Sequence, residues 1–418
     1  MVDQAVGQSP PVARNSAFYQ SLLVGLLSLN FGILFFDRNA LNFLMPFVKP
    51  DLGLSNTQVG LTSAALSFSW AVSAVVVGAA ADRSGKRKAF LIGATIAFSV
   101  CSFLSGLAQS FLMLFAARLL MGAVEGGVMP VSHTMVSSVV SPERRGLAMG
   151  IAQNFGSNLL GSCVAPVVLV WFANTLNWHS AFYIAGIPGI VSAVLLWFFI
   201  DEPKKEVVHA AAGRPDFLRQ LSGILTSRNM VLCVLISILL VSYLVVCWTF
   251  MPLYLTEVRG FNKATTGWLM STLGISATIG SFVISGVSDR IGRKPVMIAA
   301  AFLGVILPLG AIYYMGSVWV LAAIFFFGWA LTGIFPLFMA TVPSESIDHS
   351  RLATAIALVV GIGEVLGGVL SPLLAGWAAD RTGLVAALWI MFGLCIGAGL
   401  IAMGLRETAP AVLKARAG

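Results

Sequence analysis

The chain has 418 residues, of which 58% are hydrophobic and 10% are charged, and its formal net charge is +8. An average soluble domain carries about 25% charged residues, and a water-soluble core cannot bury this much apolar surface. The composition therefore excludes an ordinary soluble protein and predicts a membrane protein.

The apolar residues form twelve runs, and a helix of about 20 residues crosses about 30 Å of hydrocarbon. We therefore expect an all-α fold with twelve transmembrane helices. The polar segment 1–17 before the first run has no features of a signal peptide. The predicted spans are residues 18–46, 56–80, 89–108, 111–139, 146–173, 179–200, 230–255, 264–288, 295–315, 317–341, 352–379 and 383–405.

Basic residues are distributed unevenly between the two sides of this topology. An even number of spans places both termini on one side, which carries 19 of the 25 Lys and Arg residues; the other side carries 4, and two lie within spans. The positive-inside rule then places both termini in the cytoplasm. The positive charge is thus a topology signal, and we expect no nucleic-acid partner.

A motif recurs in the two halves of the chain. GAAADRSGKRK at 78–88 returns as GVSDRIGRKP at 286–295, so that Asp82 and Asp289 lie 207 residues apart. Two parallel six-helix repeats with a midplane site between them form a known transporter architecture. The expected organisation is a cytoplasmic tail (1–17), a six-helix bundle (18–200), a cytoplasmic linker (201–228), a second six-helix bundle (229–406) and a cytoplasmic tail (407–418).

The repeated motif resembles the loop signature between the second and third helices of the major facilitator superfamily. The resemblance implies that Asp82 and Arg83 help to latch the cytoplasmic gate, with Asp289 and Arg290 as a weaker second copy. The alternative is a topology anchor without a gating role, because the basic cluster alone holds the loop in the cytoplasm. The signature residues are Gly78, Asp82, Arg83, Gly85, Arg87, Asp289, Arg290 and Arg293.

Five ionisable residues other than histidine lie within the predicted spans: Asp37, Arg38, Arg118, Glu125 and Glu364. Each costs about 2.5 to 3.5 kcal/mol if it faces lipid alone, so we expect each to face a partner or a water-filled cavity. Arg118 and Glu125 are seven residues apart, which places them on one helix face about 10 Å apart. Asp37 lies at the depth of Arg118, and we expect these two to pair.

Buried carboxyl groups next to guanidinium groups suggest proton coupling. Desolvation favours a protonated carboxyl, whereas a nearby guanidinium favours an ionised one. We therefore expect Asp37, Glu125 and Glu364 to bind protons in competition with salt bridges, leaving Arg38 or Arg118 free for an anion. Two alternatives stay open: a permanent structural charge network, and a protonated Glu364 that is hydrogen-bonded to a neighbouring backbone.

Four segments together resemble the anion:cation symporter family: FFDRNALNFLMP at 35–46, RLLMGAVEGG at 118–127, SPERRGLAMG at 141–150 and CWTFMPLYLTEVRGF at 247–261. This family includes proton symporters for sugar acids and aromatic carboxylates. The resemblance implies that Asp37, Arg38, Arg118 and Glu125 are the functional charges. WHSAFYIAGIPGIV at 178–191 is also similar to the Spinster group, which moves amphipathic lipids and other organic compounds.

Two positions depart from the symporter pattern. Trp70 stands where sugar-acid symporters usually have Tyr, and Glu364 stands where they usually have Asn. A flat indole suits a ring, although Trp70 can equally be a packing residue. A carboxylate at 364 would repel a second negative charge on a ligand, or accept hydrogen bonds from hydroxyl or amine groups.

Further polar and aromatic residues complete the expected binding site, although such residues also serve as interhelical contacts. The expected substrate-binding set is Arg38, Arg118, Trp70, Gln153, Asn154, Asn158, Tyr243, Trp248, Trp329 and Glu364.

Signals for other functions are missing from the sequence. The five cysteines lie in apolar runs without a CxxC pair, so neither disulfides nor a metal site are expected. No HExxH, GxSxG or P-loop motif is present, and the tails are too short for the added domain of a receptor. A membrane-embedded enzyme or a receptor is therefore the less favoured alternative.

These observations predict a secondary transporter that imports an organic monocarboxylate, such as an aromatic acid or a sugar acid, together with protons. Its partners would be this small anion, protons and membrane lipid, and no catalytic residue or cofactor is expected because a proton gradient drives it. We expect a monomeric, multi-pass protein of the plasma membrane, specifically a bacterial inner membrane. The alternative is a proton-antiport exporter of an amphipathic or organic compound that uses the same charges.

Overall fold

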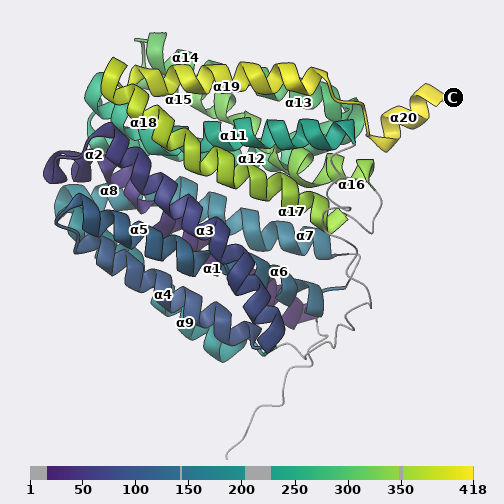
Figure 1. The fold of residues 1–418 in the computed structure, drawn as a ribbon, viewed down its shortest axis with the longest axis horizontal. Coiled ribbons are helices and arrows are strands. Elements are labelled where there is room, and N and C mark those ends of the chain that lie inside the picture. Colours follow the sequence, from purple (N-terminus) through teal and green to yellow (C-terminus); the bar gives the residue numbers. More distant parts are fainter. Residues whose placement is uncertain (1–16, 142–143, 203–226, 348–351, 418) are drawn as a thin grey trace, which may run out of the picture.

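The computed structural model describes residues 17–141, 144–202, 227–347 and 352–417, and within these ranges the chain contains helices and no strand. Twelve helical spans are long and apolar enough to cross a membrane, and they lie side by side in a single bundle (Figure 1). Each begins and ends within a few residues of its predicted bounds, except that the first span extends to Leu52. The predicted twelve-helix, all-α fold is confirmed.

The first six spans make up the N-terminal half. Several spans are divided by kinks or by π-helical segments. The elements in chain order are α1 (Ala17–Arg38), α2 (Ala40–Leu52), α3 (Asn56–Ser84), α4 (Arg87–Gly106), α5 (Phe111–Glu125), α6 (Val128–Val139), α7 (Arg145–Gly150), η1 (Ile151–Phe155), η2 (Ser157–Val164), α8 (Ala165–Thr175) and α9 (Trp178–Phe199).

The last six spans make up the C-terminal half. The predicted linker falls largely on residues 203–226, which lie outside the described residues. The elements in chain order are α11 (Arg228–Leu253), η3 (Tyr254–Val258), α12 (Lys263–Ile291), α13 (Arg293–Leu303), α14 (Ile306–Tyr313), α15 (Val318–Trp329), η4 (Ala330–Ile334), η5 (Leu337–Thr341), α16 (Val342–Ser346), α17 (Leu352–Ile362), η7 (Gly363–Leu370), α18 (Ser371–Thr382), α19 (Val385–Met403) and α20 (Pro410–Ala417).

Two helix breaks lie next to predicted functional charges. The first span breaks at Asn39, directly after Arg38, and the fourth span breaks at Gly126 and Gly127, directly after Glu125. Such breaks free backbone groups from the helical hydrogen-bond pattern. The breaks therefore place two of the charges where the backbone is irregular.

Small residues let the helices of the N-terminal half approach closely. A side chain at Gly122 of α5 would clash with the backbone of α3 at Leu66, and one at Gly156 would clash with the backbone of α1 at Ser28. Close approach at small residues is the usual basis of helix packing in membranes. It brings α5, which carries Arg118 and Glu125, against α3, and the fifth span against α1, which carries Asp37 and Arg38.

The two halves meet most closely at the end of the bundle away from the termini, which we call the distal end. There α2 and α3 pack against α11 and α18, and α8 packs against α12. In Figure 1, α2 and α18 lie together at the left, opposite the C-terminal α20. A side chain at Gly60 of α3 would clash with the carbonyl oxygen of Pro372 in the other half.

Polar contacts also join the halves at the distal end. The carboxylate of Asp380 accepts hydrogen bonds from the backbone N–H groups of Asn56 and Thr57, both at 2.8 Å, and from the Thr57 hydroxyl at 2.5 Å. Lys49 Nζ lies 2.8 and 3.0 Å from the two carboxylate oxygens of Glu257. We call these two sets of contacts the distal latch.

The buried apolar residues form separate cores in the distal part of the bundle and in the part of the N-terminal half nearer the termini. One core runs from the distal part of the N-terminal half, including Phe43 and Phe182, into the C-terminal half, including Phe250 and Phe338. The part of the N-terminal half nearer the termini has a separate core around Phe98. The structure is therefore closed between the halves at the distal end.

Candidate functional site

Four of the five predicted intramembrane charges lie together in the N-terminal half. Asp37 and Arg38 are on the last turn of α1, and Arg118 and Glu125 are on α5. Arg38 Nη1 is 3.7 Å from Glu125 Oε2, and Arg118 Nη1 is 3.5 Å from the backbone oxygen of Arg38. We call these four residues the charge cluster.

Arg118 is held in the core of this half. Its side chain is 1% exposed, its Nη2 donates to Ser105 Oγ at 2.8 Å, and its guanidinium lies 5.5 Å from the ring centre of Phe182. The carbonyl that it contacts, that of Arg38, lies at the break between α1 and α2. Because the hydrogen bonds of Arg118 go to neutral oxygens, its positive charge is not neutralised and can act on nearby carboxyl groups.

The pairing within the charge cluster differs from the predicted one. Among the described residues, Arg38 and Glu125 form the close ion pair of the cluster, whereas no ion-pair contact within 4 Å joins Asp37 to Arg118. Arg118 still acts on Asp37 electrostatically. Asp37 and Arg38 are consecutive residues on α1 and point in directions about 100° apart, so only Arg38 faces Glu125.

Both carboxyl groups of the cluster are buried without hydrogen-bond donors. Asp37 and Glu125 are each 0% exposed, and none of their four oxygen atoms accepts a hydrogen bond. Ser102 lies near Asp37, but its hydroxyl donates to the carbonyl of Phe182 at 2.9 Å. A buried ionised carboxylate without donors is unfavourable, so each group is suited to take up a proton.

Arg38 is the accessible cation of the cluster, with a side chain that is 15% exposed. Its guanidinium lies 5.3 Å from the ring centre of Trp70 and 5.6 Å from that of Phe35. The two rings hold the guanidinium in place by cation–π contact. Because a guanidinium can donate two parallel hydrogen bonds to a carboxylate, Arg38 is suited to bind an organic acid.

The remaining predicted binding residues fall into two groups. Asn154 is exposed, and Gln153, Asn158 and Glu364 are half-buried within the spans. In contrast, Tyr243, Trp248 and Trp329 pack against one another in the core, and the Tyr243 hydroxyl donates to the carbonyl of Gly304 at 2.9 Å. In this conformation these three aromatic residues are packing residues, and a role in ligand binding stays a prediction.

The predicted gate residues are only partly described. Gly85 ends α3 with a φ of +68°, which favours glycine, and Gly78 faces Pro130. The side chains of Asp82 and Arg83 lie outside the described residues, so the latch that they were expected to form stays a prediction.

In the second copy of the signature, Arg293 carries the ion pairs. It contacts Asp289 at 2.5 Å and Glu345 at 3.0 Å, while Arg290 is exposed. These partners all belong to the C-terminal half. Arg293, which is also part of the predicted signature, thus joins α12, α13 and α16, and the gating role expected of Asp289 and Arg290 stays a prediction.

Two glutamates at the ends of the halves were not predicted. Glu202 accepts hydrogen bonds from the backbone N–H of Lys88, and Glu407 accepts them from those of Arg293, Lys294, Thr408 and Ala409. Burial alone would raise the pKa of Glu407, but these backbone donors hold it below its usual range. The matching positions, each a few residues beyond the last membrane span of a half, are a repeat that the sequence could have revealed.

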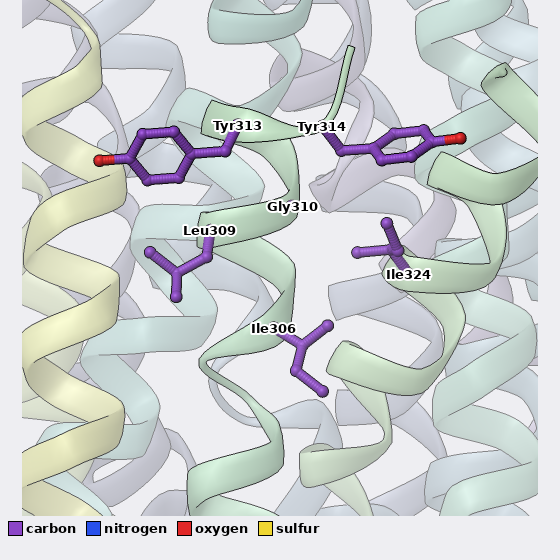
Figure 2. A pocket seen from close by; sticks show the side chains of 6 residues that line it. All are labelled: Ile306, Leu309, Gly310, Tyr313, Tyr314 and Ile324. Carbon is purple, nitrogen blue, oxygen red and sulfur yellow. The ribbon is translucent and has the colours of Figure 1, made fainter. Parts of the chain in front are cut away.

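A separate groove of about 420 Å³ lies between α14 and α15 (Figure 2). Gly310 contributes to its lining from α14, and the rings of Tyr313 and Tyr314 point in opposite directions. Its lining contains no charged side chain, so it offers nothing to balance the charge of an organic acid. The lining residues are Ile306, Leu309, Gly310, Tyr313, Tyr314 and Ile324.

Comparison with known proteins decides the family. The family model described as Major Facilitator Superfamily matches residues 27–266 and 245–418. The chain belongs to the major facilitator superfamily. It is a membrane transporter and not an enzyme, in agreement with the sequence interpretation.

Several relatives match this transporter over most of its length. A probable sulfoacetate transporter from Cupriavidus necator is 27% identical over 91% of this chain and 92% of its own length. The hexuronate transporter of Bacillus subtilis is 26% identical over 86% and 88%, and the 3-(3-hydroxy-phenyl)propionate transporter of Escherichia coli is 27% identical over 81% and 82%.

Solved structures show the same fold. A bacterial homologue of the lysosomal transporter Spinster, in an inward-facing and unoccupied conformation, superimposes with a TM-score of 0.69 at 19% identity over 96% of both chains. A D-xylose-proton symporter superimposes with a TM-score of 0.71 at 18% identity, over 94% of this chain and 98% of its own.

Proposed function

We propose that this transporter imports an organic monocarboxylate together with protons by alternating access. Arg38 and Arg118 attract the carboxylate, and Asp37 and Glu125 bind the protons. No cofactor takes part, because the proton gradient supplies the driving force. The protein works as a monomer in the bacterial inner membrane, with both termini in the cytoplasm.

The geometry of the charge cluster carries this proposal. Arg38 is accessible and bound to Glu125 at 3.7 Å, and Glu125 has no other polar partner among the described residues. A substrate carboxylate that binds Arg38 competes with Glu125 for the guanidinium. Once released, the buried Glu125 carboxylate is stabilised by taking up a proton, so that substrate and proton bind together.

The names of the relatives support an organic acid as the substrate. Those names include sulfoacetate, hexuronate, D-galactonate and 3-(3-hydroxy-phenyl)propionate, all of which are acids. Trp70 offers a flat surface beside Arg38 on which a ring could lie. Aromatic acids and sugar acids both fit this description.

The direction of access follows from topology. The excess of Lys and Arg on the side of the termini favours a cytoplasmic location for that side, and the distal latch closes the opposite side. We infer that the structure represents the state open toward the cytoplasm. Cytoplasmic release of the substrate would follow from this state.

The test is transport by purified protein in proteoliposomes, recorded as current on a capacitive sensor. Import of one anion with two protons moves one positive charge inward, which is worth about 2.3 kcal/mol per 100 mV, or nearly fifty-fold accumulation. We expect an inward positive current with sugar acids or aromatic carboxylates. Glu125→Gln should abolish this current while binding of the acid persists.

An exporter that exchanges protons for an organic compound is the second candidate. A multidrug export protein from Haemophilus influenzae is 26% identical over 51% of this chain and 41% of its own length. If no carboxylate gives a current, and an inward-directed proton gradient drives efflux of an amphipathic compound, the exporter replaces the symporter.

A further inference from the structure

Glu364 lies across the interface between the halves from the charge cluster. It is on the π-helical segment η7, which packs against α3 of the N-terminal half. A Cβ atom added to Gly368 would lie 3.4 Å from Glu364 Oε2 and 3.2 Å from Ser67 Oγ of α3. The carboxylate of Glu364 is therefore held beside α3.

The face of α3 that Glu364 meets leads directly to Arg38. Ser67 and Trp70 are three residues apart on α3 and so share one side of the helix. The Trp70 ring lies under the Arg38 guanidinium, and Arg38 is the cation that acts electrostatically on Glu364. Ser67 is 4% exposed and lies within the contact between α3 and η7, so the accessible residue between Glu364 and Arg38 on this side of α3 is Trp70.

Glu364 is available to a ligand. It is half-buried, and no hydrogen bond to its carboxylate is present among the described residues, so the alternative in which it bonds to a neighbouring backbone is not the arrangement seen here. An ionised carboxylate can only accept hydrogen bonds. A ligand that places a donor at this position gains a hydrogen bond, whereas one that places a second anion there is repelled.

We propose that Arg38 and Glu364 hold the two ends of one substrate, with its carboxylate on Arg38 and a hydroxyl or amine donor on Glu364. This inference rests on the proposed function and narrows it to monocarboxylates that carry a hydrogen-bond donor and no second anionic group. A substrate held in this way contacts both halves at once. Glu364 is thus a specificity-determining residue as well as a link between the halves.

The test compares ligands that share a skeleton and differ at the far end. The first series is 3-phenylpropionate, 3-(3-hydroxyphenyl)propionate and 3-(3-carboxyphenyl)propionate. The second is 6-deoxygalactonate, galactonate and the dianion galactarate, which differ only at the sixth carbon. Dissociation constants are measured by titration calorimetry on the full-length protein. Since a hydrogen bond to an ionised group changes affinity by roughly 10- to 100-fold, the hydroxylated acid should bind that much more tightly than its unsubstituted partner.

The variants Glu364→Gln and Glu364→Ala decide whether Glu364 causes the preference. We expect Glu364→Ala to remove the advantage of the hydroxylated acid, and Glu364→Gln to bind the dianion at least 10-fold more tightly than the wild type does. Asp51→Asn is the matched control, because it removes a carboxylate at the distal surface, where the side chain is 55% exposed. Comparing two ligands within each variant cancels any general effect on folding.

The outcomes separate the inference from the proposed function. If carboxylates of either series bind and the ratios between ligands stay the same in both Glu364 variants, the assignment of Glu364 is overturned and the proposed function stands. If no carboxylate of either series binds to the wild type, the proposed function itself fails.

Discussion

Replacement of Asp380 by Ala should open the distal end of the transporter. Asp380 lies on α18, yet its carboxylate caps the first turn of α3 in the other half through three hydrogen bonds. Loss of an N-terminal capping side chain costs about 0.5 to 2 kcal/mol, and loss of a negative charge at a helix N-terminus costs about 0.3 to 1 kcal/mol. These contacts form only while the distal end is closed, so their loss destabilises that state rather than the fold.

A total of about 1 to 3 kcal/mol corresponds to a shift of roughly 5- to 150-fold in the ratio of closed to open distal ends. Spin labels at Leu176, in the N-terminal half, and Met315, in the C-terminal half, would report the distance across this end by double electron–electron resonance. Both side chains are more than half exposed, at 60% and 74%. We expect Asp380→Ala to add or enlarge a population with a longer distance between the labels.

Asp51→Asn is the control for this experiment. Asp51 accepts a hydrogen bond from Trp178 Nε1 at 2.9 Å, a contact within the N-terminal half, so its loss should not change the distance between labels. An Asp380→Ala protein with the same distance distribution as the wild type would refute the idea that the latch stabilises the closed distal end.

Three further predictions concern single positions. Arg118→Lys should weaken substrate binding at least 10-fold in a calorimetric titration, because one ammonium cannot replace a guanidinium that spans two oxygens. Arg290→Lys, at an exposed position, should have little effect, and equal losses of affinity in both variants would contradict a role of Arg118 in substrate binding. Gly122→Ala should lower the free energy of unfolding by about 1 to 3 kcal/mol, since its methyl group meets the backbone of α3; thermal denaturation should show no such loss for Gly93→Ala, where nothing lies within 4 Å. Glu407→Gln should lower the melting temperature at pH 7 more than at pH 4. A carboxyl group whose pKa is held low stabilises the fold above its unfolded pKa of about 4.3, and this stabilisation is lost as the pH falls. If the loss of melting temperature were the same at both pH values, the shape of the Glu407 side chain rather than its charge would be responsible.

Much of the fold and part of the site follow from the sequence. Apolar length alone gave the twelve spans, because lipid requires each span to be a continuous apolar helix. The spacing of Arg118 and Glu125 placed them on one helix face, and matching depth placed Asp37 and Arg38 beside them, which the structure confirms.

The pairing of those charges could not be predicted in the same way. Whether Asp37 or Arg38 faces Glu125 depends on the rotation of α1 about its axis, which is set by contacts of glycines such as Gly156 with the backbone of α1. The distal latch was missed for a related reason. Asp380 and Thr57 are 323 residues apart, and each reads in the sequence as an ordinary polar residue at the end of a span.

The break at Asn39 allows α2 to change its angle relative to α1. The carbonyl of Arg38 at this break contacts Arg118, while the far part of α2 carries Lys49 of the distal latch. The α2 helix has 13 residues and at 1.5 Å per residue is about 20 Å long, so a change of about 10° in the bend would move its far end by about 3 Å. A displacement of that size would separate Lys49 from Glu257, so the bend at Asn39 links the contact of Arg118 with the Arg38 carbonyl to the distal latch.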